Sequence, residues 1–199
     1  MVMHHSGEFP QYYAFDADMT IVFTDMRGFT AMSETYKPRE VYRTINAILA
    51  LQTKVIHEFG GSVNKFLGDG VLACFSGEDR CERAFKCMKK LLLKIELLDR
   101  NDSYLPCHVG FGINDGHVLF GLLGDDKRRE FTVLGDTVNT AARLCGAAEA
   151  FKVLMTENFV HSLPDYLCTD DIAFVESRLF RGKRDAVRIY AITAPPLTD

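Results

Sequence analysis

The sequence predicts a single domain of the α+β class. Short apolar runs with strand character alternate with longer segments of helical periodicity, without internal repeats or low-complexity linkers. The 199 residues, 47% of them hydrophobic, are enough to bury one substantial core but not two. The formal net charge is only -4, with acidic and basic residues interspersed. The composition therefore favours neither a nucleic-acid polymer nor a membrane surface as a partner.

The chain opens with a predicted buried strand followed by helices. Residues 19–25, MTIVFTD, form a short apolar, β-branched run that ends in Asp25, and RGFT then turns the chain toward a helix. Pro38 suits the first turn of a helix, because the N–H that proline lacks has no helical partner there. Apolar residues at near-helical spacing continue from Pro38 to a stop at Gly60-Gly61.

The rest of the chain keeps alternating strands and helices. Residues 62–75 contain two short strands around a Gly-Asp-Gly turn, which is typical of a hairpin and puts Asp69 at its tip. Further elements are expected as a helix over 79–99, a strand over 106–114, an antiparallel pair over 117–123 and 129–134, a helix over 136–150 and a strand over 186–192.

Cysteine and histidine patterns do not indicate a zinc site. The six cysteines and six histidines show no spacing such as C-x-x-C or H-x-x-x-H, so reduced core thiols are expected. No apolar run approaches the roughly 18 residues needed to span a bilayer, and the N-terminus lacks the order of a signal peptide. We expect a cytoplasmic chain without direct membrane contact.

Three motifs follow one another along the chain: FTDMRGFT (23–30), NKFLGDG (64–70) and FTVLGDTVNTAAR (131–143). Together they closely resemble the catalytic domain of class III adenylyl and guanylyl cyclases over residues 15–195, leaving an N-terminal extension (1–14) and a C-terminal tail (196–199). The resemblance implies a ferredoxin-like βαββαβ core with additional strands and helices. It also implies a regulatory domain upstream of this segment.

Asp25 and Asp69 are the predicted metal ligands. Mg²⁺ prefers carboxylate oxygens, and two Mg²⁺ ions can hold the attacking and leaving oxygens of an in-line displacement at phosphorus. The alternative is that both carboxylates only cap turns. The resemblance implies two Mg²⁺ ions per site, replaceable by Mn²⁺, with the backbone carbonyl of Met26 as a further ligand.

Residues 26–30 form a predicted phosphate-binding loop. Backbone N–H groups exposed at a strand-to-helix turn attract anions, and the resemblance implies that this loop, including Phe29 and Thr30, cradles a triphosphate. The alternative is that Gly28 only permits the bend.

Lys65 and Thr132 are the predicted base-recognition pair. A lysine donor and a hydroxyl acceptor match N1 and the N6 amino group of adenine, whereas guanine presents the opposite pattern. The resemblance places this pair with adenylyl cyclases and with a bicarbonate-responsive subgroup of them; ordinary exposed strand residues are the alternative. Because side chains alternate along a strand, Lys65 and Asp69 are expected on one face.

Asn139 and Arg143 are spaced i and i+4 on a helix that Asp136 is expected to cap, so both project from one face. The resemblance implies that Asn139 orients the ribose and that Arg143 stabilises the charge developing on phosphorus; a role as plain helix-surface residues is the alternative.

The segment FRGKRDAV resembles one that contacts the β- and γ-phosphates, with Arg181 where lysine is usual and Lys183 as the second candidate. A solvated basic loop is the alternative.

The predicted reaction is attack of the ribose 3′-oxygen on the α-phosphorus of ATP, giving 3′,5′-cyclic AMP and pyrophosphate. One metal would lower the pKa of the 3′-hydroxyl and the other would hold the triphosphate; no side chain is an obvious general base. The resemblance implies a homodimer whose sites take the aspartates and Lys65 from one chain and Asn139 and Arg143 from the other. The alternatives are a guanylate cyclase, a non-catalytic regulatory partner of the same fold and, more distantly, a diguanylate cyclase.

Overall fold

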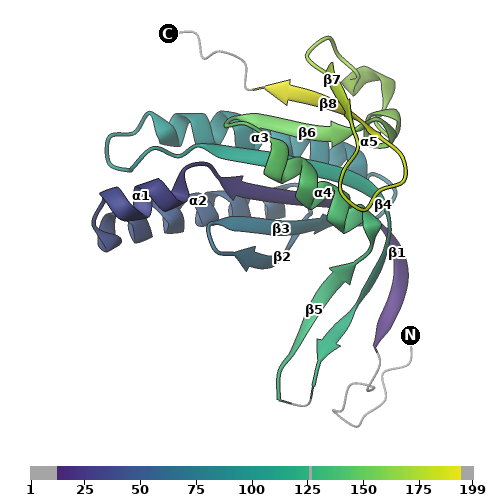
Figure 1. The fold of residues 1–199 in the computed structure, drawn as a ribbon, viewed down its shortest axis with the longest axis horizontal. Helices are drawn as coiled ribbons and strands as arrows, with labels where there is room; N and C mark the ends of the chain where they lie inside the picture. Colours follow the sequence, from purple (N-terminus) through teal and green to yellow (C-terminus); the bar gives the residue numbers. More distant parts are fainter. Residues whose placement is uncertain (1–12, 126, 194–199) are drawn as a thin grey trace.

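The computed structural model describes residues 13–125 and 127–193, so residues 1–12 of the predicted N-terminal extension and the tail 196–199 lie outside it. The described residues form one sheet of eight strands with five α-helices and a 3₁₀ helix (Figure 1). The strands are β1 (Ala14–Met26), β2 (Ser62–Leu67), β3 (Gly70–Phe75), β4 (Val109–Gly124), β5 (Arg129–Leu134), β6 (Lys152–Thr156), β7 (Ala173–Arg178) and β8 (Val187–Thr193). The helices are α1 (Phe29–Thr35), α2 (Pro38–Glu58), α3 (Arg80–Asp99), α4 (Asp136–Ala147), α5 (Glu157–His161) and the 3₁₀ helix η1 (Asp165–Leu167).

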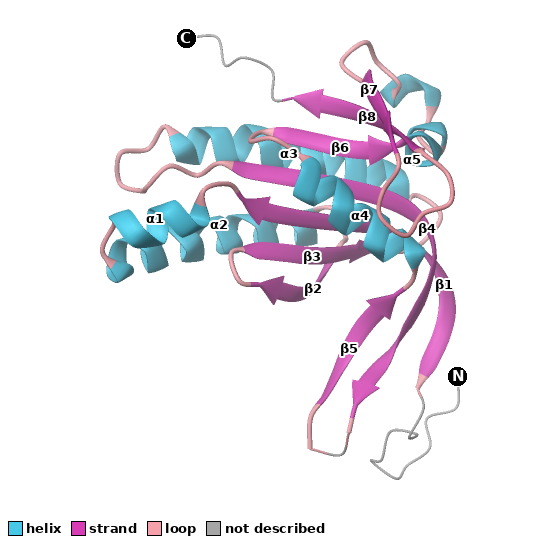
Figure 2. Ribbon diagram, in the orientation of Figure 1, coloured by secondary structure: helices cyan, strands magenta, loops and turns pink. Residues whose placement is uncertain are grey.

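The sheet topology confirms the predicted fold. The strand order is β2-β3-β1-β4-β6-β8-β7, and β5 pairs with β4 off this path. The first four strands therefore lie antiparallel in the order 2-3-1-4, with α2 after β1 and α3 after β3, which is the βαββαβ arrangement of a ferredoxin-like core. Helices α2 and α3 cover one face of the sheet and α4 crosses the other (Figure 2). Strands β5 to β8 are the additions to this core.

Strands β1 and β4 are longer than the sequence predicts. They pair antiparallel along the whole of β1, from Ala14 to Met26. The two strands expected over 106–114 and 117–123 are therefore one strand, because Gly116 between them stays paired with β1 instead of opening a turn. The distal part of β4 pairs with β5 as a projecting hairpin (Figure 1). We call its described residues, 117–125 and 127–134, the arm.

The two long helices begin and end where the sequence indicates. Helix α2 starts at Pro38, and the backbone N–H of Lys37 donates to the Glu40 carboxylate at 3.1 Å, which satisfies one of the free donors at the helix end. The helix ends before Gly60. The residues of α2 that face the core are Val41, Thr44, Ile48, Gln52, Val55 and Ile56. The apolar members of this face pack on the sheet together with the apolar face of α3, in the largest hydrophobic cluster of the described residues.

Helix α4 lies unusually close to β4. A Cβ at Gly112 of β4 would lie 2.2 Å from both the Ala141 oxygen and the Cys145 nitrogen of α4, so only glycine permits this approach. The face of α4 that includes Ala141 and Cys145 is buried against the sheet. Asn139 is exposed and Arg143 is partly exposed, so the close packing fixes both side chains on the accessible side of the helix.

Cysteines contribute mainly to the core. Five of the six are buried and free, as predicted, whereas Cys168 is exposed. Burial raises the pKa of the Cys74, Cys87 and Cys145 thiols to about 12, so these thiols stay protonated and unreactive at neutral pH. Within the described residues, no helix has the length and apolar character required to cross a bilayer.

Candidate active site

Asp25 and Asp69 lie close together where strand β1 ends and strand β3 begins. Asp25 is the second-last residue of β1, and Asp69 occupies the turn between β2 and β3. Strand β3 pairs with β1 as far as Val71 opposite Thr24, and the Val71 N–H donates to the Thr24 hydroxyl at 3.0 Å. The hairpin turn therefore sits beside the end of β1. The structure brings the two predicted metal ligands close enough for the charge of one to act on the other.

The carboxyl group of Asp69 is a perturbed acid. Burial raises its pKa above the usual value, the backbone N–H groups of Asp69 and Met26 oppose the rise, and the negative charge of Asp25 adds to it. The guanidinium of Arg27 lowers the pKa by a smaller amount. A cation placed between the two carboxylates would relieve their repulsion.

The raised pKa of Asp69 predicts a pH dependence of stability in the metal-free chain. Between the usual Asp value of 3.8 and the raised value, the native state binds more protons than the unfolded state, so the free energy of unfolding falls as the pH rises through this window. We expect Asp69→Asn to abolish this fall in urea denaturation measured from about pH 4 to pH 7.

Asp125 provides a control of opposite sign. The backbone N–H groups of Arg128 and Lys127 donate to its carboxylate and lower its pKa. Its contribution to stability is therefore present above the unfolded pKa and lost as the pH falls through the folded pKa. If Asp69→Asn and Asp125→Asn changed the pH profile in the same direction, the raised pKa assigned to Asp69 would be wrong.

Arg27 lies beside these two carboxylates and was not predicted from the sequence. Its NH1 lies 3.1 Å from Oδ2 of Asp25, and its NH2 donates to the backbone carbonyl of Cys145 in α4 at 2.7 Å. A basic residue two positions after a predicted metal ligand gives only a weak signal of charge pairing. The contact with a carbonyl 118 residues further along the chain has no sequence signal.

The donor set suits a hard divalent cation. Within residues 13–125 and 127–193, no group of three or more His, Cys, Asp or Glu side chains could hold a metal ion. Mg²⁺ does not need such a cage, because it keeps several waters and is commonly bound by one or two carboxylates together with substrate phosphates. Two neighbouring carboxylates therefore fit Mg²⁺ or Mn²⁺ that binds with a phosphorylated ligand.

The loop after β1 has the geometry of a strand-to-helix turn. Gly28 has a φ of 75°, in the left-handed region that favours glycine, and precedes the first residue of α1. Phe29 packs partly buried against the main core, and Thr30 is exposed. No side chain within the described part of the molecule caps α1, so the backbone N–H groups of its first turn lack a side-chain partner beside Asp25.

Lys65 reaches toward the strand that carries Thr132. Its Nζ lies 2.8 Å from Oε1 of Glu130 on β5, and this partner was not predicted. Because side chains alternate along a strand, Glu130 and Thr132 share one face of β5. Thr132 itself is only 6% exposed. The structure thus places the two predicted base-recognition residues on neighbouring elements of the same chain.

The expectation that Lys65 and Asp69 share a strand face is wrong. Strand β2 ends at Leu67, and its register with β3 shifts just before Lys65. Asp69 lies in the following turn, where the alternation of strand side chains no longer applies. The Asp69 carboxyl is held near Asp25 and the Lys65 amine near β5, so the two side chains serve different clusters.

The predicted helix cap of α4 is also wrong. Asp136 is the first residue of the helix, Gly135 occupies the cap position, and no side chain caps this end among the described residues. The Asp136 carboxylate instead pairs with Lys183 from the loop before β8. A negative charge in the first turn still interacts favourably with the helix dipole.

The loop that carries Arg181 passes beside Arg143 of α4. The NH2 of Arg143 would be 3.8 Å from a Cβ at Gly182, so the loop that carries Arg181 runs beside this guanidinium. Arg181 is exposed, and among the described residues its side chain has no ion pair or hydrogen bond. Lys183 is already engaged by Asp136. Of the two basic candidates, Arg181 is the one free to bind an external anion.

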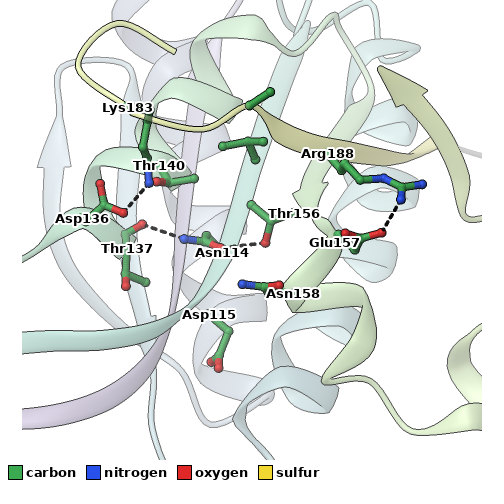
Figure 3. A pocket seen from close by; sticks show the side chains of 12 residues that line it. Asn114, Asp115, Asp136, Thr137, Thr140, Thr156, Glu157, Asn158, Lys183 and Arg188 are labelled. Carbon is green, nitrogen blue, oxygen red and sulfur yellow. Dashed lines mark hydrogen bonds and ion pairs between the residues drawn. The ribbon is translucent and has the colours of Figure 1, made fainter. Parts of the chain in front are cut away.

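A separate cavity of about 370 Å³ adjoins the buried side of α4. Figure 3 shows the Lys183–Asp136 and Arg188–Glu157 ion pairs on opposite sides of this polar space, with Asn114 between them. The amide of Asn114 donates to the Thr137 carbonyl at 3.2 Å. None of Asp25, Asp69, Lys65, Thr132, Asn139 or Arg143 lines the cavity, so it is not the predicted nucleotide site.

Five of the predicted site residues therefore form two clusters within one chain, apart from Lys65 and Thr132. The first is the carboxylate cluster, Asp25 and Asp69; the second is the α4 cluster, Asn139, Arg143 and Arg181. Among the described residues, no hydrogen bond or ion pair joins the two clusters directly. The Arg27 contact with Cys145 links the first cluster to the far end of the helix that carries the second.

Comparison with known proteins places the chain in a family. A family model described as the adenylate and guanylate cyclase catalytic domain matches residues 12–194. The chain belongs to this family. The cyclase domain is 35% identical over 187 residues to an adenylate cyclase of Anabaena cylindrica, covering 88% of the chain and 37% of that protein. It is 31% identical over 181 residues to the terminal-differentiation-specific adenylate cyclase of Dictyostelium discoideum, covering 87% of the chain and 8% of that protein.

A solved structure shows the same fold. The crystal structure of the guanylyl cyclase Cya2 matches with a TM-score of 0.80 at 26% identity, covering 93% of this cyclase domain and 97% of that chain. The relatives thus include both adenylate and guanylate cyclases. The domain spans well under half the length of the two adenylate cyclases.

Proposed function

We propose that this cyclase domain converts ATP to 3′,5′-cyclic AMP and pyrophosphate. The observation that carries the proposal is the placement of Lys65 beside the face of β5 that holds the buried Thr132. An amine donor and a hydroxyl acceptor at one location match the N1 and N6 groups of adenine and mismatch guanine. The 35% identity to an adenylate cyclase favours the same substrate.

The carboxylate cluster would hold two divalent cations. Asp25 and Asp69 supply the charged oxygens, and the Met26 carbonyl at the end of β1 is a further candidate ligand. Bound Mg²⁺ or Mn²⁺ would supply positive charge to the attacking and leaving oxygens. The uncapped first turn of α1, with Phe29 and Thr30, would receive the triphosphate through its backbone N–H groups.

The α4 cluster would act on the ribose and the phosphates. Asn139 can orient the ribose by hydrogen bonding, and Arg143 can stabilise the negative charge that develops on the α-phosphate. Arg181, exposed and without a partner in the described part of the chain, would neutralise the β- and γ-phosphates. Most of the catalysis would come from positioning and charge stabilisation.

A homodimer would combine the two clusters. We propose that the carboxylate cluster of one copy faces the α4 cluster of a second, giving two equivalent sites. Because Lys65 pairs with Glu130 on the strand that leads into α4, we assign Lys65 to the half-site of Thr132, Asn139 and Arg143. This replaces the expectation from the sequence, which grouped Lys65 with the aspartates. The arm and the edge strand β2 expose large apolar side chains that a second copy would cover: Phe66, Leu67, Leu119, Leu123, Phe131 and Leu134.

Product identification tests the proposal. The purified chain is incubated with Mg²⁺ or Mn²⁺ and with ATP or GTP, and the products are separated, identified and quantified by mass spectrometry. We expect cyclic AMP from ATP in excess over cyclic GMP from GTP. Predominant cyclic GMP would favour a guanylate cyclase, for which the match to Cya2 is the supporting observation. No cyclic product under any condition would favour a non-catalytic regulatory partner.

Base recognition predicts a change of specificity. In the variant Lys65→Glu, Thr132→Ala, the hydrogen-bonding groups suit guanine, so the ratio of kcat/KM for ATP to that for GTP should fall by at least about tenfold. The structure adds a requirement: Glu130→Gln must accompany the change, because Glu130 would otherwise lie against the new carboxylate. The control Glu130→Gln alone should keep the preference for ATP. An unchanged ratio in the triple variant would refute the assignment of Lys65.

Thr132 also supports a proposal about regulation. We propose that bicarbonate modestly increases turnover, because the Lys/Thr pair resembles that of bicarbonate-responsive cyclases. The measurement is cyclic AMP formation against bicarbonate concentration at constant pH and ionic strength, with chloride as the control anion. A flat titration would remove this proposal and leave the substrate assignment intact.

A further inference from the structure

Arg27 bridges the carboxylate cluster and helix α4 through one guanidinium group. One terminal nitrogen, NH1, lies 3.1 Å from Oδ2 of Asp25. The other, NH2, donates to the Cys145 carbonyl at 2.7 Å and lies 3.7 Å from the Cys145 Sγ. A planar guanidinium can make both contacts at once because its donors form a rigid fork. The charge of Arg27 is therefore held beside Asp25 by a contact that does not depend on Asp25.

The surroundings of Arg27 restrict the guanidinium to this position. A Cβ at Gly110, which lies opposite Asp25 on β4, would come within 2.8 Å of both Nε and NH2 of Arg27, so the absence of a side chain there makes room for the group. The Nε of Arg27 is buried without a hydrogen-bond partner. Leaving a buried donor unpaired is costly, so the two contacts of the terminal nitrogens must account for this placement.

We propose that Arg27 is a positioning residue that neutralises Asp25 while no metal is bound. When a divalent cation binds Asp25, the guanidinium gives up its ion pair with this carboxylate. Its contact with the Cys145 carbonyl then changes at the end of α4. The inference rests on the proposed function, because it takes Asp25 to be a metal ligand. A divalent cation on Asp25 would lie close to the guanidinium, and like charges at such separations repel. Arg27 therefore weakens metal binding to the nucleotide-free chain and favours entry of the metal together with the negatively charged nucleotide.

The contact with α4 gives the exchange a second consequence. The Cys145 carbonyl accepts from Arg27 and also from the backbone N–H of Ala148 at 3.0 Å. A guanidinium released by Asp25 is free to strengthen or shift its bond to this carbonyl. In the proposed dimer, each chain gives its carboxylate cluster to one site and its helix α4, with Asn139 and Arg143, to the other. Metal binding in one site would therefore alter the position of a helix that forms part of the other site.

The first test measures metal binding without nucleotide. Mn²⁺ is titrated into the chain, and free Mn²⁺ is followed by electron paramagnetic resonance. Arg27→Gln keeps a donor for the Cys145 carbonyl but removes the charge, and we expect it to tighten Mn²⁺ binding about threefold, within the range of a partly exposed ion pair. Equal or weaker binding in Arg27→Gln would overturn the role given to Arg27.

Arg83 offers a matched control. Its Nε lies 2.9 Å from Asp79, its side chain is 25% exposed as that of Arg27 is, and it also donates to backbone carbonyls. Arg83→Gln should leave Mn²⁺ affinity unchanged; a similar tightening there would overturn the inference by showing a general charge effect.

The variant Asp25→Asn distinguishes failure of the proposed metal site from failure of the role given to Arg27. If it binds Mn²⁺ as the unaltered chain does, the metal assignment of the proposed function fails; if it weakens binding while Arg27→Gln has no effect, only the inference about Arg27 fails.

The second test begins with the unaltered chain, so its first result does not depend on a variant that folds. In the unaltered chain, the buried Nε–H of Arg27 and the N–H of Ala148 should give nuclear magnetic resonance signals that move when Mg²⁺ is added, while the Nε–H of Arg83 stays in place. Signals of Arg27 and Ala148 that do not respond to saturating Mg²⁺ would overturn the proposal. In Arg27→Gln, the response of Ala148 should be lost even though Mg²⁺ binds.

Discussion

Replacing Asp25 with alanine is expected to reduce cyclic AMP formation by at least about 10³-fold, because the charge stabilisation that a metal centre supplies amounts to several kcal/mol. Asp25 is the carboxylate at the end of β1, and its neighbour Asp69 is the only other acidic side chain assigned to the cluster. Asp69→Ala should have an effect of the same order. The measurement is the initial rate of product formation at saturating Mg²⁺ and ATP.

The variant should fold normally, since the Asp25 side chain is 45% exposed and its ion pair with Arg27 is partly exposed as well. Asp79→Ala is the matched control, because Asp79 also pairs with an arginine but follows the opposite end of β3 from Asp69. Full activity of Asp25→Ala with an unchanged melting temperature would show that the carboxylate cluster holds no catalytic metal.

Mixing two inactive variants is expected to restore activity. If each site takes its aspartates from one chain and Arg143 from the other, a dimer of Asp25→Ala with Arg143→Ala contains one intact site and one doubly altered site. Random exchange makes half of the dimers mixed, so activity should recover to about a quarter of that of the unaltered chain. The assay is cyclic AMP formation after the variants have been co-refolded or exchanged at low concentration.

The structure supplies the negative control for this mixing. Asp25 and Asp69 belong to the same cluster, so a mixture of Asp25→Ala and Asp69→Ala has no intact site in any dimer and should remain inactive. Restoration in both mixtures would contradict the shared site, as would failure of the first mixture when the mixed dimer is shown to form by differential tagging.

Much of the fold follows from local patterns. The apolar run that ends at Asp25, the proline that starts α2 and the Gly-Asp-Gly turn at Asp69 are each defined by neighbouring residues, and the structure places all three as expected. The ferredoxin-like core was implied by the resemblance to the cyclase catalytic domain, and the sheet order confirms it. Length was underestimated in β1 and β4, because their pairing is stabilised by each other and not by the residues within either strand.

The candidate site was less predictable where it depends on contacts between distant segments. The pairing of Lys65 with Glu130, the ion pair between Asp136 and Lys183, and the bridge from Arg27 to Cys145 each join residues at least 47 positions apart. Spacing rules describe neighbours on one helix or strand and say nothing about such partners. The assumption that Lys65 and Asp69 share a face failed for a related reason: the turn interrupts the alternation between them.

The ladder between β1 and β4 also determines where the chain can change in length. Asp25 sits opposite Gly110 near one end of this ladder, and the arm grows from the other end. Gaining or losing a single residue in either strand would turn every later side chain to the opposite face of the sheet. The side chains of Asp25 and of the arm would then lie on the opposite face of the sheet from the one they occupy now. We therefore expect loop insertions, epitope tags or fluorescent labels to be tolerated only outside the paired stretch. The ladder fixes the distance between the carboxylate cluster, where we propose metal binding, and the arm, where we propose contact with a second copy.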